Sequence, residues 1–286
     1  MKIKLPTLLL TMLAIAVQAS AALLQPVILA SKGEPSILMV GQSATVPVTI
    51  KQTVPAGSVI TTGSNGRVAV ALGEGQLVVL DSNTQLSIRS VQNDSGGAVV
   101  DLLYGTLRCS VDPERSGSGP AFTIMAGKES IQSKGTVWQT SKAADGTTTT
   151  VCLVSTVTVT IKGNLMIDVP AGSVLISTYA NGVWTGSKVI NLATGQTTTY
   201  SPDGAGGYTS AVSVSSITEL GQARDAFQTA LGQLTDMILN AQSAALNVVI
   251  GQINGVLSAA GLPTLTPPAG ISNSAERDSI VSPEQP

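Results

Sequence analysis

The sequence predicts a mainly β protein, and three observations support this prediction. The chain is rich in Gly, Ser, Thr and Val, while only 3% of its residues are aromatic and 11% are charged. Apolar residues alternate with polar or small ones, as at Val68, Val70 and Leu72, before a turn at 73–75. Segments of this kind recur at roughly 8–15-residue intervals between residues 54 and 212, as in all-β folds. We therefore expect one β-rich domain over 54–212.

Some of these strands carry apolar residues at consecutive positions, as in Leu77 to Leu80. Such strands are covered on both faces, because no side of them is polar. The hexapeptide Val54 to Val59 recurs as Val169 to Val174, each containing Pro-Ala-Gly. Pro followed by Gly suits a tight turn that enters a strand. The echo is either a pair of equivalent turns or a coincidence.

The first residues resemble a secretory signal. Lys2 and Lys4 precede an apolar run, 8–17, and Ala19-Ser20-Ala21 fits the small-residue pattern that signal peptidase reads. We therefore predict a signal peptide over 1–21, cleaved between Ala21 and Ala22. A buried N-terminal helix is the alternative. The apolar run is too short to anchor the chain in a bilayer, so we expect a periplasmic or secreted protein. Residues 22–53 then form an N-terminal leader of mixed character, in which Val46, Val48 and Ile50 alternate like the start of a strand.

The charge balance excludes one class of partner. The chain has 15 basic and 17 acidic residues, and the predicted signal removes two of the lysines. Nucleic-acid binding requires a basic surface, so we expect no nucleic-acid partner.

Composition changes near residue 213. Apolar residues then recur at spacings of three and four, which predicts an amphipathic helix within 213–261, ended by Gly261-Leu262-Pro263. Its apolar stripe consists of Ile217, Leu220, Phe227, Leu231, Leu234, Ile238, Ala241, Ala245 and Val248. The stripe either packs within the chain or mediates self-association through residues 217–256 as a short coiled coil. Asn247, Gln252 and Asn254 argue against a membrane span. Residues 262–286 are dominated by Pro, Ser and charge, and we expect a disordered tail.

No catalytic constellation is evident, and we predict neither a catalytic nor a metal site, nor a cofactor. The chain contains no His, the commonest general base and metal ligand. Asp101, Asp112 and Glu114 are the densest carboxylates, and their turn-rich context favours a solvated rim. Ser130 and Lys134 bracket a strand and turn, so they do not form a Ser–Lys pair on one helix face.

Cys109 and Cys152 are the two cysteines. An isolated pair in an exported protein favours a disulfide. One pattern opposes this: Cys109 alternates with Leu107 and Val111, whereas Cys152 is out of phase with its apolar neighbours Val151 and Leu153. Two buried thiols or an intermolecular bond are the alternatives.

The order of several motifs resembles the FecR domain family. The motifs are Val54 to Gly63 with Asn65-Gly66-Arg67, Val68 to Leu80, Asn83 to Ile88, Leu103 to Arg108, Ser133 to Thr136, and Thr149 to Val159. Lys134 stands where the family usually has Arg, Ser155-Thr156 replace a usual Glu-Gly, and the two cysteines lie outside the family pattern.

The resemblance implies an extracytoplasmic, β-solenoid-like FecR-type domain. In the namesake regulators this domain receives a signal from an outer-membrane transporter and passes it through a membrane helix to a sigma factor. The predicted mature chain contains no such helix, so we expect a free-standing, non-catalytic member. Its expected role is structural or protein-interacting, with an envelope protein as partner. The alternative is a carbohydrate- or envelope-polymer-binding domain that stacks sugars on Trp138 and Trp184, although both could equally pack in the core.

Overall fold

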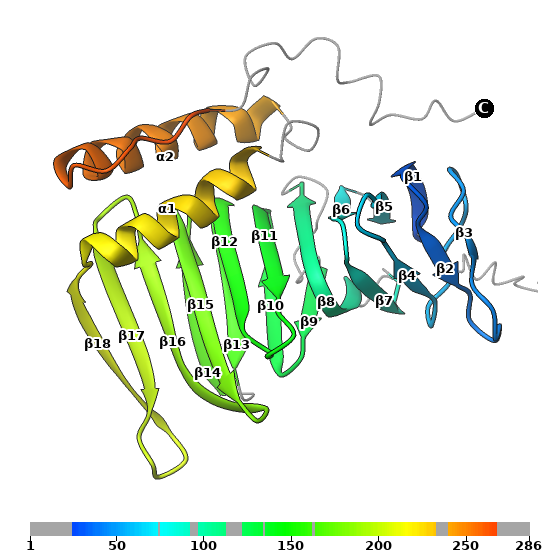
Figure 1. Cartoon of the computed structure of the whole chain (residues 1–286), viewed down its shortest axis with the longest axis horizontal. Helices are drawn as coiled ribbons and strands as arrows, with labels where there is room; N and C mark the ends of the chain where they lie inside the picture. The colour runs from blue at the N-terminus through cyan, green and yellow to red at the C-terminus, as the bar shows by residue number, and fades with distance from the viewer. Residues whose placement is uncertain are drawn as a thin grey trace, which may run out of the picture.

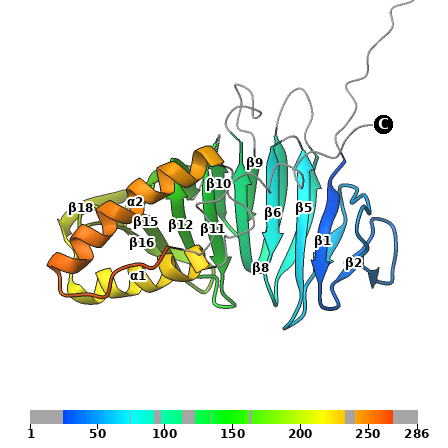
Figure 2. The same ribbon diagram turned by 90° about the horizontal axis from the view of Figure 1, so that it is seen from above.

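The computed structural model describes residues 25–73, 75–91, 97–112, 122–133, 135–161, 164–232 and 240–267. The described strands form two sheets stacked face to face, and two helices cover one of them (Figures 1 and 2). The chain is therefore mainly β, as predicted. The predicted signal peptide, with Ala21 and Ala22, lies outside the described residues.

The sheet under the helices is called the helix-side sheet. Its strands, in pairing order, are β1 (Val27–Lys32), β5 (Arg67–Gly73), β6 (Gln76–Leu80), β8 (Ala98–Val111), β11 (Val137–Lys142), β12 (Thr148–Val154), β15 (Ser173–Ala180), β16 (Val183–Asn191), β17 (Gln196–Pro202) and β18 (Tyr208–Val214). All of these pairings are antiparallel.

The other layer is called the far sheet. Its strands, in pairing order, are β3 (Val46–Pro47), β2 (Ser36–Leu38), β4 (Val59–Thr61), β7 (Gln85–Ser90), β8, β9 (Phe122–Ala126), β10 (Glu129–Ser133), β13 (Thr156–Ile161) and β14 (Leu165–Pro170). The β8–β9 pairing is parallel and the others are antiparallel.

Strand β8 belongs to both sheets and turns the corner between them. Its residues 99–104 pair with β7 of the far sheet, whereas 105–110 pair with β11 of the helix-side sheet. Gly105 occupies the corner with φ of 93°, a conformation that residues with a side chain rarely adopt.

Hairpins alternate between the two layers along the chain. β5–β6, β11–β12 and β15–β16 lie in the helix-side sheet, while β9–β10 and β13–β14 lie in the far sheet. The alternation stops after β16, because β17 and β18 continue the helix-side sheet. The far sheet ends at β14, so the helix-side sheet extends beyond it.

The repeated Pro-Ala-Gly segments are equivalent turns. Gly57 and Gly172 both adopt positive φ, 88° and 79°, and each is followed by a fully buried serine, Ser58 or Ser173. A strand begins directly after each turn. The echo in the sequence therefore reflects one local geometry used twice, once in each sheet.

The interior has two apolar cores. One lies between the sheets, and the other lies between the helix-side sheet and the helices. Strand β12 contributes to both: Cys152 faces the core between the sheets, while Val151 and Leu153 face the helices. The prediction that consecutive apolar residues mark strands covered on both faces is confirmed for Leu77 to Leu80 of β6, where Val78 and Leu80 face the core between the sheets and Val79 faces the core shared with the helices.

Of the predicted leader, 22–53, the described residues 25–53 do not stand apart from the β-rich domain, since β1 pairs with β5 and β2 pairs with β4. Short, irregular strands obscured this in the sequence.

The helical region differs from the single predicted helix, because the structure has α1 (Ile217–Gly232) and α2 (Asn240–Ala259). Both bury their apolar faces in the same core, including Phe227 of α1 and Ile253 of α2. A single straight helix could not place both segments on the same part of the sheet. Ser216 and Glu219 form a reciprocal capping box at the start of α1. Because Leu220, Phe227 and Leu231 are buried within the chain, they are not available for a coiled coil.

The predicted tail begins later than residue 262. Leu265 is buried, its N–H donates to Asn254 Oδ1 at 2.7 Å, and the Thr266 N–H donates to Gln228 Oε1 at 2.8 Å. The rest of the predicted tail lies outside the described residues. Within the described ranges, no helix is both long and apolar enough to cross a membrane.

Candidate functional site

Both tryptophans predicted as ligand-stacking residues lie in the core between the sheets. Trp138 is fully buried and packs against Phe122 with ring centroids 5.7 Å apart. Trp184 is 3% exposed and its Nε1 donates to Ser187 Oγ at 2.8 Å. Neither ring can stack on a ligand, so the core-packing alternative is confirmed and the stacking prediction is wrong.

Cys109 and Cys152 are free thiols, so the predicted disulfide is absent. Trp138 of β11 pairs with Cys109 on one side and with Cys152 on the other. Neighbouring strands lie about 4.8 Å apart, and a disulfide needs Cα atoms within about 7 Å. The intervening strand therefore keeps the two thiols too far apart, although both face the same core.

We predict that the mature protein carries two reduced, protected thiols. Burial raises the pKa of the Cys152 thiol to about 12 and raises that of Cys109 well above its ordinary value. Since the thiolate is the reactive form, an alkylating reagent should label neither cysteine in the native protein and both after unfolding without reductant. Mass spectrometry of the exported protein measures this directly. If the unfolded protein is not labelled and its mass is lower by two hydrogens, the two cysteines form a disulfide. That result would contradict the strand order.

Two arginines of the FecR-like motifs meet at Asp81, in a partly buried charge cluster on the helix-side sheet. Asp81, at the end of β6, accepts from Arg108 of β8 in a buried ion pair and lies 3.2 Å from Arg67 of β5. Arg108 is 1% exposed. These three residues join β5, β6 and β8, so the motif positions hold the scaffold together.

Threonine hydroxyls bond the turns of the same region to one another. Thr62 Oγ1 accepts from the Thr84 N–H, and Thr84 Oγ1 accepts from the Thr106 N–H, both at 2.9 Å. Thr62 and Thr84 are 22 positions apart, and so are Thr84 and Thr106. The two bonds therefore connect three turns that follow one another along the chain.

A second buried polar cluster forms around Glu129 and links the two sheets by hydrogen bonds. Glu129 begins β10 of the far sheet and is fully buried. Its carboxylate accepts from Thr148 Oγ1 at 2.7 Å and from the Tyr179 hydroxyl at 2.8 Å, both in the helix-side sheet. Burial raises the pKa of Glu129, and hydrogen bonds from Thr148, Tyr179 and Ser177 partly offset the rise.

We predict that Glu129 makes stability fall with rising pH. The folded protein holds this proton more tightly than the unfolded chain, whose carboxyl has a pKa near 4.5. The contribution is fully present below that value and is lost as pH rises through the folded-state pKa. In urea titrations from pH 4 to 8, Glu129→Gln should remove this decline. Tyr179→Phe should extend it to higher pH, because a hydrogen bond to the ionised form is lost. A Glu129→Gln profile parallel to that of the unmodified protein would contradict this role.

The remaining chemistry candidates form no site. Asp101 pairs with Arg89 at the surface, at 2.6 and 2.9 Å. Ser130 lies in the middle of the β9–β10–β13 pairing, while Glu114 and Lys134 lie outside the described residues. In the described ranges, no three His, Cys, Asp or Glu side chains gather where they could hold a metal ion.

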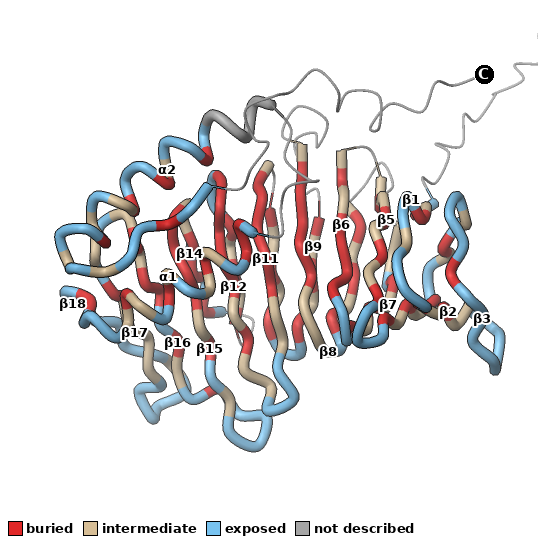
Figure 3. Tube along the Cα trace, turned by 45° about the horizontal axis from the view of Figure 1, so that its top comes forward, coloured by how far each residue is buried: buried red, intermediate tan, exposed pale blue. Residues whose placement is uncertain are grey.

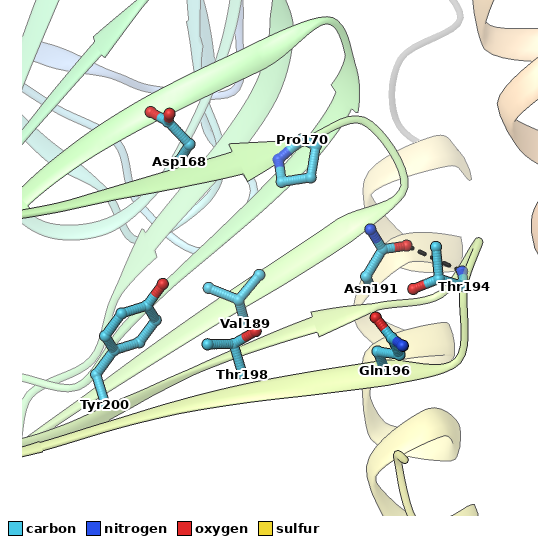
Figure 4. A pocket seen from close by; sticks show the side chains of 8 residues that line it. All are labelled: Asp168, Pro170, Val189, Asn191, Thr194, Gln196, Thr198 and Tyr200. Carbon is cyan, nitrogen blue, oxygen red and sulfur yellow. Dashed lines mark hydrogen bonds between the residues drawn. The ribbon is translucent and has the colours of Figure 1, made fainter. Parts of the chain in front are cut away.

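An open groove lies where the helix-side sheet extends past β14 (Figure 4). Its volume is about 220 Å³. β14 forms one wall and β16 and β17 form the floor. The lining residues are Asp168, Pro170, Val189, Asn191, Thr194, Gln196, Thr198 and Tyr200.

The groove floor is the inner face of the extended sheet. Val189 and Thr198 pair directly across β16 and β17, and Val189 faces the core between the sheets. Asn191 braces the β16–β17 turn, because its Oδ1 accepts from the N–H groups of Ala193 and Thr194 at 3.0 and 3.1 Å. Burial raises the pKa of Tyr200, and the nearby Tyr208 and Asp168 raise it further. The floor therefore combines apolar, hydroxyl and amide groups without a cation.

The groove occupies the place of the next strand of the far sheet. β14 pairs with β13 on one side, and no described strand pairs with its other side. Backbone N–H and C=O groups along a free edge are ready partners for an added strand. The arrangement can thus accept an extended polypeptide, with main-chain bonds to β14 and side chains against Val189 and Thr198. The sequence does not reveal this site, because the groove arises from the order of hairpins rather than from a motif.

Comparison with known proteins identifies one part of the chain. The family model described as FecR protein matches residues 58–158, so this segment is a FecR domain, as its motifs predict. A search of curated proteins found no match. The groove residues lie beyond the matched segment.

Two crystal structures, at 1.65 and 2.50 Å resolution, are similar at low identity. Both are of a protein proposed to be an anti-sigma factor from Parabacteroides distasonis ATCC 8503, with 16% identity and a TM-score of 0.38. The alignments cover 44% of this chain and 57% of that protein. This similarity is too distant to indicate a shared function.

Proposed function

We propose that this chain is an exported, non-catalytic FecR-type module that holds a partner protein at the cell envelope. The open groove beside β14 carries this proposal, because it offers an unpaired strand edge above an uncovered sheet face. The partner contributes an extended segment that continues the far sheet. The signal-like first residues support export to the periplasm or the cell exterior.

In this proposal the segment with the FecR-type motifs is a rigid scaffold, and the groove beside β14 binds the partner. Arg67 and Arg108 of the FecR-type motifs are committed to internal ion pairs with Asp81, which lies between two of the motifs. The groove residues leave a strand edge and a sheet face uncovered.

A solenoid-like organisation of the scaffold is part of the same proposal. The Gly172 N–H donates to Cys152 O at 2.9 Å beside the β12–β15 pairing, after the chain has formed the β13–β14 hairpin in the far sheet. This return of the chain to the same sheet after a hairpin in the other sheet supports stacked coils. A solenoid interacts through its concave or terminal surfaces, and here the C-terminal end is the one left open.

Carbohydrate binding is the weaker alternative. Its expected stacking residues, Trp138 and Trp184, are buried.

Site-specific photo-crosslinking tests the proposal. A benzophenone amino acid replaces Thr198 on the groove floor, and Val248, an exposed position on α2, serves as the control. In cells that export the protein, position 198 should give one heavier adduct that position 248 does not. Asp168→Lys should weaken that adduct, since it places a long cationic side chain at the groove wall. Equal adducts from both positions, or none from 198, would argue against a binding site in the groove.

A further inference from the structure

Strand β18 is an edge strand without the features that normally protect an edge. It pairs with β17 alone among the described strands, and all seven of its residues are exposed (Figure 3). Val212 is 65% and Val214 is 84% exposed. Natural edge strands are usually blunted by Lys, Pro, bulges or shortness, yet β18 contains no charge and no proline.

The opposite end of the molecule is protected in the expected ways. β3, at the edge of the far sheet, has two residues, and one of them is Pro47, which lacks an N–H. β1, at the edge of the helix-side sheet, carries a bulge between Ile28 and Ala30. The contrast indicates that β18 is covered in the working protein, whereas the N-terminal end is not extended by another strand.

The sequence of β18 is complementary to itself in antiparallel pairing. If Ala211 lies opposite its own copy, Tyr208 faces Val214, Thr209 faces Ser213 and Ser210 faces Val212. Aromatic with β-branched and Thr with Ser are favourable cross-strand pairs. No like charges meet anywhere along the strand.

A two-fold axis that passes between the two β18 strands, beside Ala211, gives a closed, isologous contact in which both copies use the same surface. From these observations we propose that two copies of the chain associate through antiparallel pairing of β18 with β18, joining their helix-side sheets into one. Ile217 begins α1 three residues after β18 and is 65% exposed, so it adds apolar surface near the end of this strand. An edge contact of this size buries less area than a standard interface, so we expect a dimer that dissociates at roughly micromolar concentration.

This inference goes beyond the proposed function, because the dimer would form at the free backbone edge of β18, whereas the groove lies between β14 and the inner face of β16 and β17. The two surfaces adjoin, since Val212 of β18 pairs with Thr198 of the groove floor. The two-fold pairing would place both grooves on the same face of the joined sheet. A failure of self-association would leave the groove proposal intact, and a failure of crosslinking from Thr198 would leave the dimer intact.

Sedimentation velocity on the mature full chain, over a concentration series from about 1 to 200 µM, tests the proposal. The unmodified protein should shift from monomer to dimer. Val212→Lys should abolish the shift, because it brings two cations close to the two-fold axis. Val248→Lys is the matched control, since it makes the same change at a similarly exposed position on α2, and it should leave the dimer unchanged.

The register has its own test. Under mild oxidation Ala211→Cys should form an intermolecular disulfide, because residue 211 meets itself across the axis. Thr209→Cys should form little, since residue 209 faces Ser213 of the second copy. The buried thiols of Cys109 and Cys152 do not compete.

Three results would overturn the proposal. One is a protein that stays monomeric at every concentration, which would assign the edge to a strand from a different protein. Another is a dimer that survives Val212→Lys. The last is efficient crosslinking of Thr209→Cys without crosslinking of Ala211→Cys.

Discussion

Replacing Gly105 with alanine is expected to prevent stable folding. Gly105 lies at the corner of β8 with φ of 93°. A Cβ there would meet Thr84 Cα at 2.5 Å and Asn83 O at 2.6 Å, and both are backbone atoms that cannot rotate away. Backbone strain and overpacking each cost roughly 1–3 kcal/mol. Together they remove a large part of the stability of an ordinary domain.

The measurement is the urea midpoint of Gly105→Ala, with Gly221→Ala as the control. Gly221 lies in α1, and nothing approaches its added Cβ within 4 Å. Alanine is the better helix former by roughly 1 kcal/mol, so the control should be equally or more stable. Similar midpoints for the two variants would contradict the corner geometry of β8.

Replacing Asp81 with asparagine is expected to give the second large loss of stability. Asp81 is the carboxylate that faces both Arg67 and the buried Arg108. The substitution removes this counter-charge from a guanidinium that is 1% exposed. Breaking a buried ion pair from one side costs roughly 3–5 kcal/mol. The melting temperature should fall by roughly 6–20 °C, at about 2–4 °C per kcal/mol for a chain of this size, with aggregation where β5, β6 and β8 separate.

Asp101→Asn is the matched control, because Asp101 also holds an arginine across neighbouring strands. Its partner, Arg89, has a side chain that is 56% exposed. Exposed pairs contribute about 0–1 kcal/mol, so this variant should melt close to the unmodified protein. Equal losses for Asp81→Asn and Asp101→Asn would show that Asp81 has no special structural role.

The sequence predicts which strand faces are buried better than it predicts the order of the strands and the arrangement of the helices. Alternation at Val68, Val70 and Leu72 correctly places a strand with one face in the core. Consecutive apolar residues in β6, Leu77 to Leu80, correctly indicate burial on both faces, because Val79 lies in the core that the helices share. The FecR-type motifs identify the domain, since their spacing follows the turns that stack along the two sheets.

The errors have a common physical cause, which is that sequence spacing does not give the order of strands. Cys109 and Cys152 face the same core, but β11 lies between them. The spacing of 217–256 fits one helix or two, and only the shared core beneath Phe227 and Ile253 shows that the chain folds back. The groove is created where hairpin alternation stops, so no single residue marks it.

The most direct test of the interaction function is amide hydrogen exchange on the protein bound to the partner that Thr198 crosslinks. The free edge of β14 should exchange quickly in the unbound protein, because its outward amides have no described strand partner. Partner binding should slow exchange within Leu165–Pro170 and leave the buried β11 unchanged. Protection of β14 without change at β11 is the predicted result. Protection confined to α2 or to the N-terminal strands, with β14 exchanging as before, would contradict a strand-accepting groove.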